Sequence, residues 1–160
     1  MNAQEIKSIL DVQFSDAILG ADLETASPYL IIEVSRWHEI SEFCKTDENL
    51  FFDSLMSLSA TDIGVTIEVI IHLHSFKHNH RIALKANVKK DEENIATVSD
   101  LWATADWHER EAYDLLGVVF ENHPNLTRIL LPDDWEGFPL RKDYVPQETY
   151  HGIPVPKVKE

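Results

Sequence analysis

The stretch Val65-Thr-Ile-Glu-Val-Ile-Ile-His-Leu73 decides the fold of this 160-residue chain. Its odd-numbered residues are apolar and alternate with Thr, Glu, Ile and His, which predicts a β-strand with one buried face and one wetter face. Residues 81–89 repeat the alternation with their apolar side chains at even positions, and the short polar link between the two runs predicts a β-hairpin. If the two apolar sets share a face, Leu73 lies on the core side together with Ile82.

The segments before the hairpin alternate between helical and extended patterns. Asn2 and Glu5 have the spacing of a capping box, and the apolar stripe that follows predicts a helix over residues 3–13. Strands are predicted at residues 16–21, 29–34 and 55–60. Between the second and third of these strands, Ser35 is the expected cap of a helix at 36–45, whose apolar face carries Trp37, Ile40 and Cys44.

The segment after the hairpin has a helical pattern. A short helix is predicted to begin at Thr97 or Ser99 and to end at Trp102. A second helix is predicted to begin at Asp106, with a Glu at its third position as in a capping box, and to end at Gly117. The fold class predicted for this part of the chain is α+β, with helices covering one face of an antiparallel sheet.

Residues 118–160 differ in composition and in hydrophobic pattern from the domain that precedes them, residues 1–117. Six of the seven prolines lie there, and no regular period survives. The segment nevertheless holds many apolar side chains, which an isolated Pro-rich chain cannot easily bury. The domain carries 21 acidic and 9 basic residues, whereas the segment carries 7 and 5. We therefore expect an acidic domain followed by an extended, Pro-rich C-terminal segment that lies on a partner, on its own domain, or on both.

The net charge of −14 argues against two classes of partner. It disfavours nucleic acid, because phosphates reward clustered Lys and Arg. It also disfavours direct binding to an anionic membrane surface. Basic protein partners stay open, beside the alternative that acidity only keeps the protein soluble.

Cysteine count and hydropathy indicate the cellular compartment of the protein. The single cysteine, Cys44, excludes an internal disulfide and a Cys-ligated cluster. The N-terminus lacks the basic and apolar regions of a secretory signal. The longest apolar run, residues 69–71, is far too short to span a bilayer. The sequence predicts a protein of the cytosol, or one bound peripherally at the cytosolic side of a membrane without insertion.

Four histidines near the hairpin turn, His72, His74, His78 and His80, suggest a metal site, because paired His-x-His can ligate zinc or copper. The expected register argues against it. His72 and His74 point away from the core, whereas His80 has the parity of the core side. A solvated hairpin end is preferred, and a His-rich metal-binding protein is kept as a minor alternative.

Motifs for nucleophilic catalysis and for nucleotide binding are absent from the sequence. Cys44 lies on the expected apolar helix face, where a free thiol is usually inert. There is no Gly-x-Ser-x-Gly elbow, and the five glycines form neither a dinucleotide fingerprint nor a phosphate loop. We therefore predict no catalytic, cofactor-binding or metal-ligating residue on this chain.

The densest charged cluster is Trp107-His-Glu-Arg-Glu-Ala-Tyr-Asp-Leu-Leu-Gly117. On a helix, Trp107, Arg110, Glu111 and Asp114 share one arc, and Arg110 can pair with Asp114 at i, i+4. The two glutamates of the cluster point apart, which is poor geometry for an acid–base pair. The arc is either a solvated charged face or a recognition surface, because Trp and Arg anchor interfaces.

These residues belong to a longer pattern in which His123-Pro-Asn-Leu126, Arg128-Ile-Leu130 and Asp133-Asp-Trp-Glu-Gly-Phe-Pro-Leu-Arg-Lys-Asp-Tyr144 follow. The combination closely resembles the signature of the 30 kDa subunit family of respiratory complex I, the NADH:quinone oxidoreductase. The resemblance is strong from about Ser99 to Tyr144 and looser before it. Many relatives carry a basic residue at the position of Thr127 and a His at that of Phe138, which puts a polar contact at each position in doubt.

The resemblance implies a subunit of the quinone module in the peripheral arm of a proton-translocating enzyme, on the cytoplasmic face of the inner (plasma) membrane. It implies contact with the forty-nine-kilodalton "D" subunit, along which residues 118–160 would lie, and with other peripheral-arm subunits. The chain itself is expected to hold no cofactor, with flavin and iron–sulfur clusters on partner subunits, and to support electron transfer from NADH to quinone as a structural and assembly subunit. The alternative is the equivalent subunit of a membrane-bound hydrogenase or of a ferredoxin- or F420H2-linked oxidoreductase.

The predicted partner interface joins the helix cluster to charged, aromatic and conformationally special positions of the C-terminal segment. Arg and Lys in an extended segment can bond a partner's carboxylates and carbonyls. The predicted interface residues are Trp107, Glu109, Arg110, Glu111, Asp114, His123, Pro124, Arg128, Asp133, Trp135, Gly137, Pro139, Arg141, Lys142 and Asp143.

Overall fold

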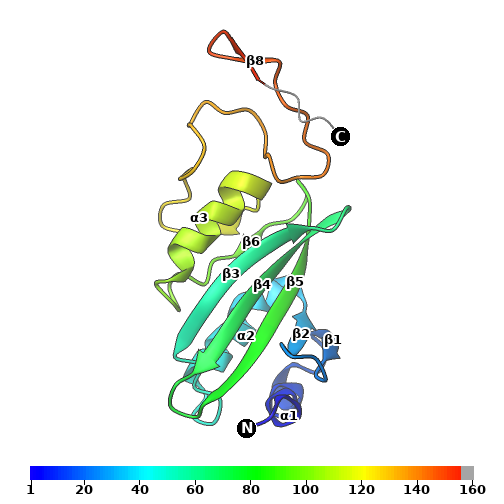
Figure 1. Cartoon of the computed structure of the whole chain (residues 1–160). Helices are drawn as coiled ribbons and strands as arrows, with labels where there is room; N and C mark the ends of the chain where they lie inside the picture. The colour runs from blue at the N-terminus through cyan, green and yellow to red at the C-terminus, as the bar shows by residue number, and fades with distance from the viewer. Residues whose placement is uncertain (156–160) are drawn as a thin grey trace.

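A five-stranded sheet of order β1-β2-β5-β4-β3 organises the computed structural model, which describes residues 1–155 (Figure 1). Its strands are β1 Ile18–Asp22, β2 Tyr29–Ile32, β3 Ser54–Asp62, β4 Thr66–Ser75 and β5 His80–Lys89. The α+β class is confirmed. The sheet is mixed rather than wholly antiparallel, because β2 pairs in parallel with β5. A helix and two further strands separate these two in the sequence, and they provide the crossover that a parallel pair needs.

The central hairpin has the predicted register. β4 and β5 are antiparallel, and Leu73 lies opposite Ile82. The apolar residues of both strands are buried on one side, where α1 Ala3–Phe14 and α2 Trp37–Thr46 pack. In Figure 1, α2 lies behind the sheet and the other sheet face is turned to the viewer. The period-two pattern therefore identified both the pairing and the buried face.

The predicted capping box at the start of α1 is confirmed. Asn2 Oδ1 accepts from the backbone N–H of Glu5, and a Glu5 carboxylate oxygen accepts from that of Asn2, both at 2.9 Å. The prediction of Ser35 as the cap of α2 is wrong. A 3-10 turn, η1 Val34–Arg36, leads into α2 without a side-chain cap.

The helix predicted from Thr97 or Ser99 to Trp102 is not formed. A two-residue strand, β6 Ile95–Ala96, pairs in parallel with β7 Phe120–Glu121, and turns follow it. The hydroxyl of Thr97 and the backbone N–H of Val98 bond instead to the buried carboxylate of Glu109. Thr97 and Val98 therefore have hydrogen-bond partners without forming a helix.

The last helix, α3 Ala105–Leu116, stands beside the edge strand β3 (Figure 1). It ends at Gly117 as predicted, because this residue has a φ of 73° that glycine adopts without strain. Its N-cap is Thr104, whose hydroxyl donates to the carbonyl of Leu55 rather than capping the helix, so the prediction of an Asp106 cap is wrong.

The chain beyond Gly117 runs around the end of α3 and finishes in a small hairpin, β8 Thr149–Tyr150 and β9 Ile153–Pro154. Residues 156–160 of the predicted C-terminal segment lie outside the described residues. Within residues 1–155, no helix is long and apolar enough to cross a membrane.

A buried aspartate joins the end of the sheet to this C-terminal segment. Asp62 accepts from Nζ of Lys90 (2.6 Å), from the backbone N–H of Lys142 (2.8 Å) and from that of Gly64 (2.7 Å). Burial alone would raise the pKa of Asp62, but these hydrogen bonds outweigh burial and lower the pKa to about 2.

We expect Asp62→Asn to lower the free energy of unfolding by about 1–3 kcal/mol near neutral pH, because the bond to a charged Lys is weakened. The folded-state pKa lies below the ordinary value of 3.8, so the carboxylate's contribution is complete above that pH and is lost as pH falls through about 2. The difference in thermal unfolding midpoint between wild type and Asp62→Asn should therefore become smaller in acid. The exposed Asp133→Asn is the control, and a gap independent of pH would contradict the assignment.

Candidate functional site on α3 and the C-terminal segment

Two carboxylates of α3, Glu109 and Asp114, are completely buried. The prediction that Asp114 shares a solvent-facing arc with Arg110 and pairs with it is therefore wrong. Trp107 and Glu111 do face solvent. The helix wheel fails here because the C-terminal segment covers one side of α3.

Asp114 lies in a cradle formed by the C-terminal segment. Its Oδ2 accepts from three successive backbone N–H groups, those of Ile129 (3.0 Å), Leu130 (2.7 Å) and Leu131 (3.0 Å). Its Oδ1 accepts from Nη1 of Arg128 at 2.8 Å. Burial alone would raise the pKa of Asp114, but the guanidinium and the three amides outweigh burial and lower the pKa.

Arg128 connects this cradle to the rest of the segment. Its Nη1 also donates to the backbone carbonyl of Asp114, and its Nη2 donates to the carbonyls of Trp135 and Gly137. One side chain thus fixes two turns of the segment against the end of α3. The planar guanidinium suits this role because its donors point in several fixed directions.

A second arginine fastens the same region from the other side. Arg141 donates through Nε to the carbonyl of Leu116 at 2.6 Å and through Nη1 to both carboxylate oxygens of Asp91 at 3.0 Å. The ring of Phe138 lies between the two guanidinium groups, 5.3 Å from that of Arg128 and 4.6 Å from that of Arg141. A Cβ at Gly117 would come within 2.6 Å of both Phe138 and Arg141, so the packing excludes larger residues there.

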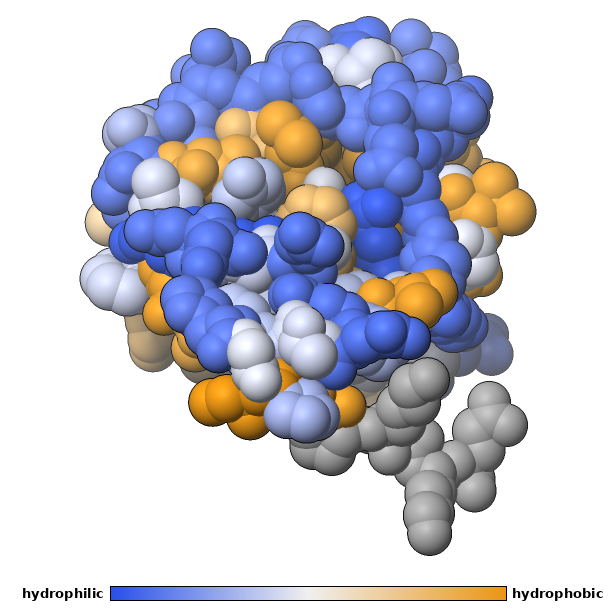
Figure 2. Space-filling model, turned by 90° about the horizontal axis from the view of Figure 1, so that it is seen from above, coloured by the Kyte–Doolittle hydropathy of each residue, from blue (hydrophilic) through white to orange (hydrophobic). Residues whose placement is uncertain are grey.

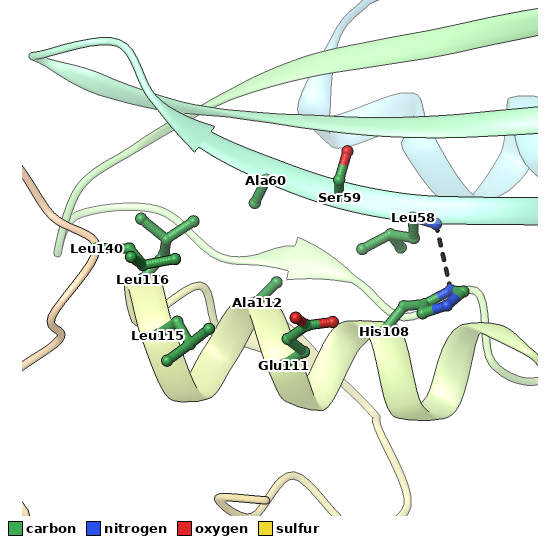
Figure 3. Close-up of a pocket in the computed structure, with 9 residues that line it drawn as sticks. All are labelled: Leu58, Ser59, Ala60, His108, Glu111, Ala112, Leu115, Leu116 and Leu140. Atoms are coloured by element: carbon green, nitrogen blue, oxygen red, sulfur yellow. Dashed lines mark hydrogen bonds between the residues drawn. The ribbon is translucent and has the colours of Figure 1, made fainter. Parts of the chain in front are cut away.

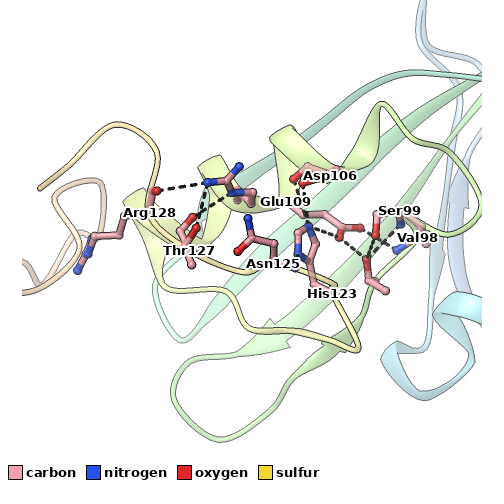
Figure 4. Close-up of polar contacts among 10 residues, drawn as sticks. Val98, Ser99, Asp106, Glu109, His123, Asn125, Thr127 and Arg128 are labelled. Atoms are coloured by element: carbon pink, nitrogen blue, oxygen red, sulfur yellow. Dashed lines mark hydrogen bonds and ion pairs between the residues drawn. The ribbon is translucent and has the colours of Figure 1, made fainter. Parts of the chain in front are cut away.

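The two positions at which this chain departs from many relatives both make contacts. Thr127 Oγ1 accepts from Nη2 of Arg110 at 3.0 Å, and the Thr127 carbonyl accepts from Nε of Arg110 at 3.2 Å (Figure 4). A hydrogen bond therefore exists at Thr127, where one was in doubt. At Phe138, the guanidinium groups of Arg128 and Arg141 lie over the aromatic ring.

Glu109 occupies a separate buried cluster, shown in Figure 4. Its carboxylate accepts from the hydroxyl of Thr97 and from the backbone N–H of Val98 at 2.7 Å. His123 Nε2 lies 3.7 Å from it. The cluster ties the loop after β6 to α3 and to the first turn of the C-terminal segment.

The contacts of His123 assign its proton. Nε2 faces the backbone carbonyl of Asp106 at 3.3 Å, so it donates there. Nδ1 accepts from the backbone N–H of Asn125 at 3.0 Å, so it carries no proton. Nε2 also lies 3.3 Å from a carboxylate oxygen of Asp106, so the ring lies beside two carboxylates of α3, those of Asp106 and Glu109.

Burial dominates the ionisation of Glu109. It raises the pKa of this carboxyl to about 7, against the opposing hydrogen bonds from Thr97 and Val98. Repulsion from two further carboxylates, Asp100 and Asp106, also raises the pKa. Glu109 thus gains a proton in the folded state near neutral pH, whereas Asp114 stays ionised.

A small cleft lies between β3 and α3 (Figure 3). Its volume is about 110 Å³, and its walls include Ala60, Glu111, Leu115 and Leu140. At one end, the backbone N–H of Leu58 donates to Nδ1 of His108 at 3.3 Å. The cleft is much smaller than the sites that hold organic cofactors.

Several large apolar side chains of α3 and the C-terminal segment face solvent. Trp107 is 62 % exposed, Leu130 61 %, Leu140 59 % and Val145 83 %. Figure 2, a view onto this end of the molecule, shows apolar patches among hydrophilic ones. Exposed apolar side chains held in a fixed arrangement are typical of protein interfaces.

The predicted interface residues fall into three groups. The exposed residues are Trp107, Glu111, Pro124, Asp133, Gly137, Lys142 and Asp143. The partly buried ones are Arg110, His123, Arg128, Trp135, Pro139 and Arg141. Glu109 and Asp114 are fully buried, so they cannot touch a partner and act inside the chain. Sequence reasoning missed Thr97, which bonds Glu109, and Asp91, which pairs with Arg141.

The hairpin histidines are divided between the two sheet faces, as their parity predicted. His80 is buried, and its Nε2 lies 2.6 Å from the carbonyl of Leu50. His72 and His74 lie on the opposite face. No group of three or more His, Cys, Asp or Glu side chains that could hold a metal ion occurs within residues 1–155.

The fold and this site define an α+β protein whose C-terminal segment is fastened to its last helix by the ion pair of Arg128 with the buried Asp114. Residues 30–150 match the family described as "Respiratory-chain NADH dehydrogenase, 30 Kd subunit", and the chain belongs to that family. It is 44 % identical over 151 residues to the C subunit of NADH-quinone oxidoreductase from Chloroherpeton thalassium, covering 92 % of this chain and 63 % of that one. It is 42 % identical over 148 residues to the same protein of Chlorobium phaeobacteroides, covering 90 % and 89 %.

Solved structures share the fold. The trypsin-resistant fragment of Nqo5 superposes with a TM-score of 0.65 at 22 % identity, over 79 % of this chain and all of that one. A chain of the membrane-bound sulfane sulfur reductase, an archaeal respiratory membrane complex, gives 0.72 at 21 % identity, over 89 % and 84 %.

We expect Asp114→Asn to release the C-terminal segment while the sheet stays folded. The substitution leaves Arg128 without its buried counter-charge, a loss of about 3–5 kcal/mol for such pairs. Hydrogen exchange should show the amides of residues 129–131 losing protection, with those of β4 and β5 unchanged. The exposed Glu111→Gln is the matched control, and full protection in Asp114→Asn would contradict the role of the carboxylate.

We also expect Glu109 to make stability depend on pH near neutrality. Its folded-state pKa of about 7 lies above the ordinary value of 4.5, so the folded state binds the proton more tightly. Stability is therefore lost as pH rises from about 4.5 to about 7, by up to about 3 kcal/mol. Glu109→Gln, which mimics the protonated acid, should match wild type at low pH and exceed it in thermal midpoint at pH 8. Equal midpoints at both pH values would refute this.

Proposed function

We propose that this chain is a non-redox structural subunit of the peripheral arm of a proton-translocating NADH:quinone oxidoreductase. The observation that carries the proposal is the set of exposed apolar side chains, Trp107, Leu130, Leu140 and Val145, on α3 and on a segment fastened to it. The fastening consists of the ion pair of Arg128 with Asp114 and the hydrogen bond from Arg141 to the carbonyl of Leu116. An interface whose side chains are ordered in advance loses less entropy on association. The relatives named as the C subunit of NADH-quinone oxidoreductase support the choice of complex.

In this role the chain binds no redox cofactor, and flavin and iron–sulfur clusters belong to partner subunits. The lone, buried Cys44 cannot supply the set of thiolates that a cluster needs. The partner that we propose is the forty-nine-kilodalton-type D subunit, in contact with α3 and the C-terminal segment, with other peripheral-arm subunits nearby. The assembly would sit peripherally on the cytoplasmic face of the inner (plasma) membrane.

The proposal is tested by tagging the full chain in its native host and isolating it from solubilised membranes. A D-type subunit and NADH:quinone reductase activity should be recovered together. Recovery of the tagged chain with a hydrogenase or with a ferredoxin- or F420H2-linked enzyme would assign it to a related complex. Recovery of the chain alone would refute the subunit role.

A matched pair of substitutions tests the surface. Trp107→Ala removes an aromatic side chain that is 62 % exposed on α3, whereas Phe76→Ala removes one that is 69 % exposed at the β4–β5 turn. We expect Trp107→Ala to lower the recovery of the D subunit at least about fivefold, since interface Trp residues contribute more than about 1 kcal/mol. Phe76→Ala should leave recovery unchanged. Equal recovery with both variants would contradict the placement of the interface.

A further inference from the structure

The sheet face opposite α1 and α2 carries a hollow that the proposed function does not use. Its volume is about 420 Å³, within the range of small-molecule sites. It crosses β3, β4 and β5 near the turn that joins β4 to β5. This face is turned to the viewer in Figure 1, and no helix of residues 1–155 is drawn across it.

Two neighbouring rows of the sheet form the floor of the hollow. In one row, Ser57 of β3 lies opposite His72 of β4. In the next row, His74 of β4 lies opposite Arg81 of β5. Because residues two apart on a strand share a face, the imidazoles and the guanidinium project to the same side.

Apolar groups wall the hollow at its two ends. Met56 is the extra residue where the register of β3 and β4 shifts, and its side chain is 60 % exposed. Pro28, directly before β2, lies at the other end of the hollow. Its carbonyl accepts a hydrogen bond from the backbone N–H of Ala83 at 2.9 Å.

The charges around the hollow are unusual for this protein. The chain has 28 acidic and 14 basic residues, yet His72, His74 and Arg81 line the hollow and no acidic residue does. Within residues 1–155 none of the three forms an ion pair, whereas Lys85 on the same face pairs with Glu68. The guanidinium of Arg81 therefore lies opposite an imidazole, with no counter-charge among the residues that line the hollow.

The polar atoms here also have unused bonding capacity. Nδ1 of His74 is buried and has no hydrogen-bond partner among the described residues. Arg81 makes one side-chain hydrogen bond within the same part of the chain, from Nη2 to the carbonyl of Ala26 at 3.2 Å. Most of its fork of donors therefore stays available to a ligand.

We propose that this hollow binds an oxyanion, a carboxylate or a phosphate carried on a small apolar body. Arg81 supplies a planar fork of donors that matches either group. His72, His74 and Ser57 add donors from the adjacent strands, and Met56 and Pro28 contact the apolar part. Nothing in the site on α3 depends on this ligand.

The test is a titration of the full-length chain followed by NMR signals of its histidine rings, at constant ionic strength set with chloride. The probes are inorganic phosphate, phenyl phosphate and benzoate, at about pH 6, where free imidazole is mostly protonated. We expect saturable shifts of the His72 and His74 signals, with phenyl phosphate binding more tightly than inorganic phosphate. Tighter binding of benzoate would assign the ligand as a carboxylate, and tighter binding of phenyl phosphate as a phosphate ester.

A matched pair of variants makes the test specific. Arg81→Gln should weaken binding by at least about tenfold, because it removes a charge-assisted contact. Lys89→Gln removes a charge from the same sheet face at the far end of β5 and should leave binding unchanged. Both side chains are exposed, so neither change disturbs the core. Shifts that do not saturate, or equal weakening in both variants, would overturn the proposal.

Discussion

The arrangement of the C-terminal segment depends on one buried carboxylate, that of Asp114. An ionised group without solvent is costly unless partners surround it, and here a guanidinium and three consecutive backbone amides do so. Those partners all come from residues 128–131, which have no regular secondary structure. The need to satisfy a single charge thus gives a defined position to a segment that neither a helix nor a sheet would order. Arg128 also donates to the carbonyls of Trp135 and Gly137, which fixes the position of these two residues as well.

The sequence predicted those parts of the fold that depend on neighbouring residues. The alternation in residues 65–73 and 81–89 identified the hairpin, its register and its buried face, because a strand places every second side chain on the same side. The capping box at Asn2 and the end of α3 at Gly117 follow from equally local rules. The sequence did not predict the parallel pairing of β2 with β5, which depends on where the chain returns after a crossover. The small pair of strands β6 and β7, which lie on either side of α3 in the sequence, was missed for the same reason.

The candidate site shows a different limit. A helix wheel placed Asp114 beside Arg110, in the preceding turn, although its partner is Arg128, well beyond the end of the helix. No period marks residues 118–155, so nothing local indicates which side of α3 they cover. The same problem affected Glu109, whose position suited a capping box but whose carboxylate bonds Thr97 and Val98 in the interior. The family resemblance joined these residues in one motif, while their individual contacts required the three-dimensional structure.

The two buried acids of α3 lie in opposite electrostatic environments little more than one helical turn apart. Asp114 has a full set of positive and polar partners, which keep it ionised. Burial, together with the nearby carboxylates of Asp100 and Asp106, favours the protonated form of Glu109. Both groups direct their hydrogen bonds inward, to the loop after β6 and to the C-terminal segment. Among the charged residues that α3 and that segment leave facing solvent, a few large apolar side chains are also exposed, as at Trp107 and Leu130. A motif for which the sequence left a solvated charged face or a recognition surface open therefore contributes two of its acids, Glu109 and Asp114, to the internal fastening of the chain.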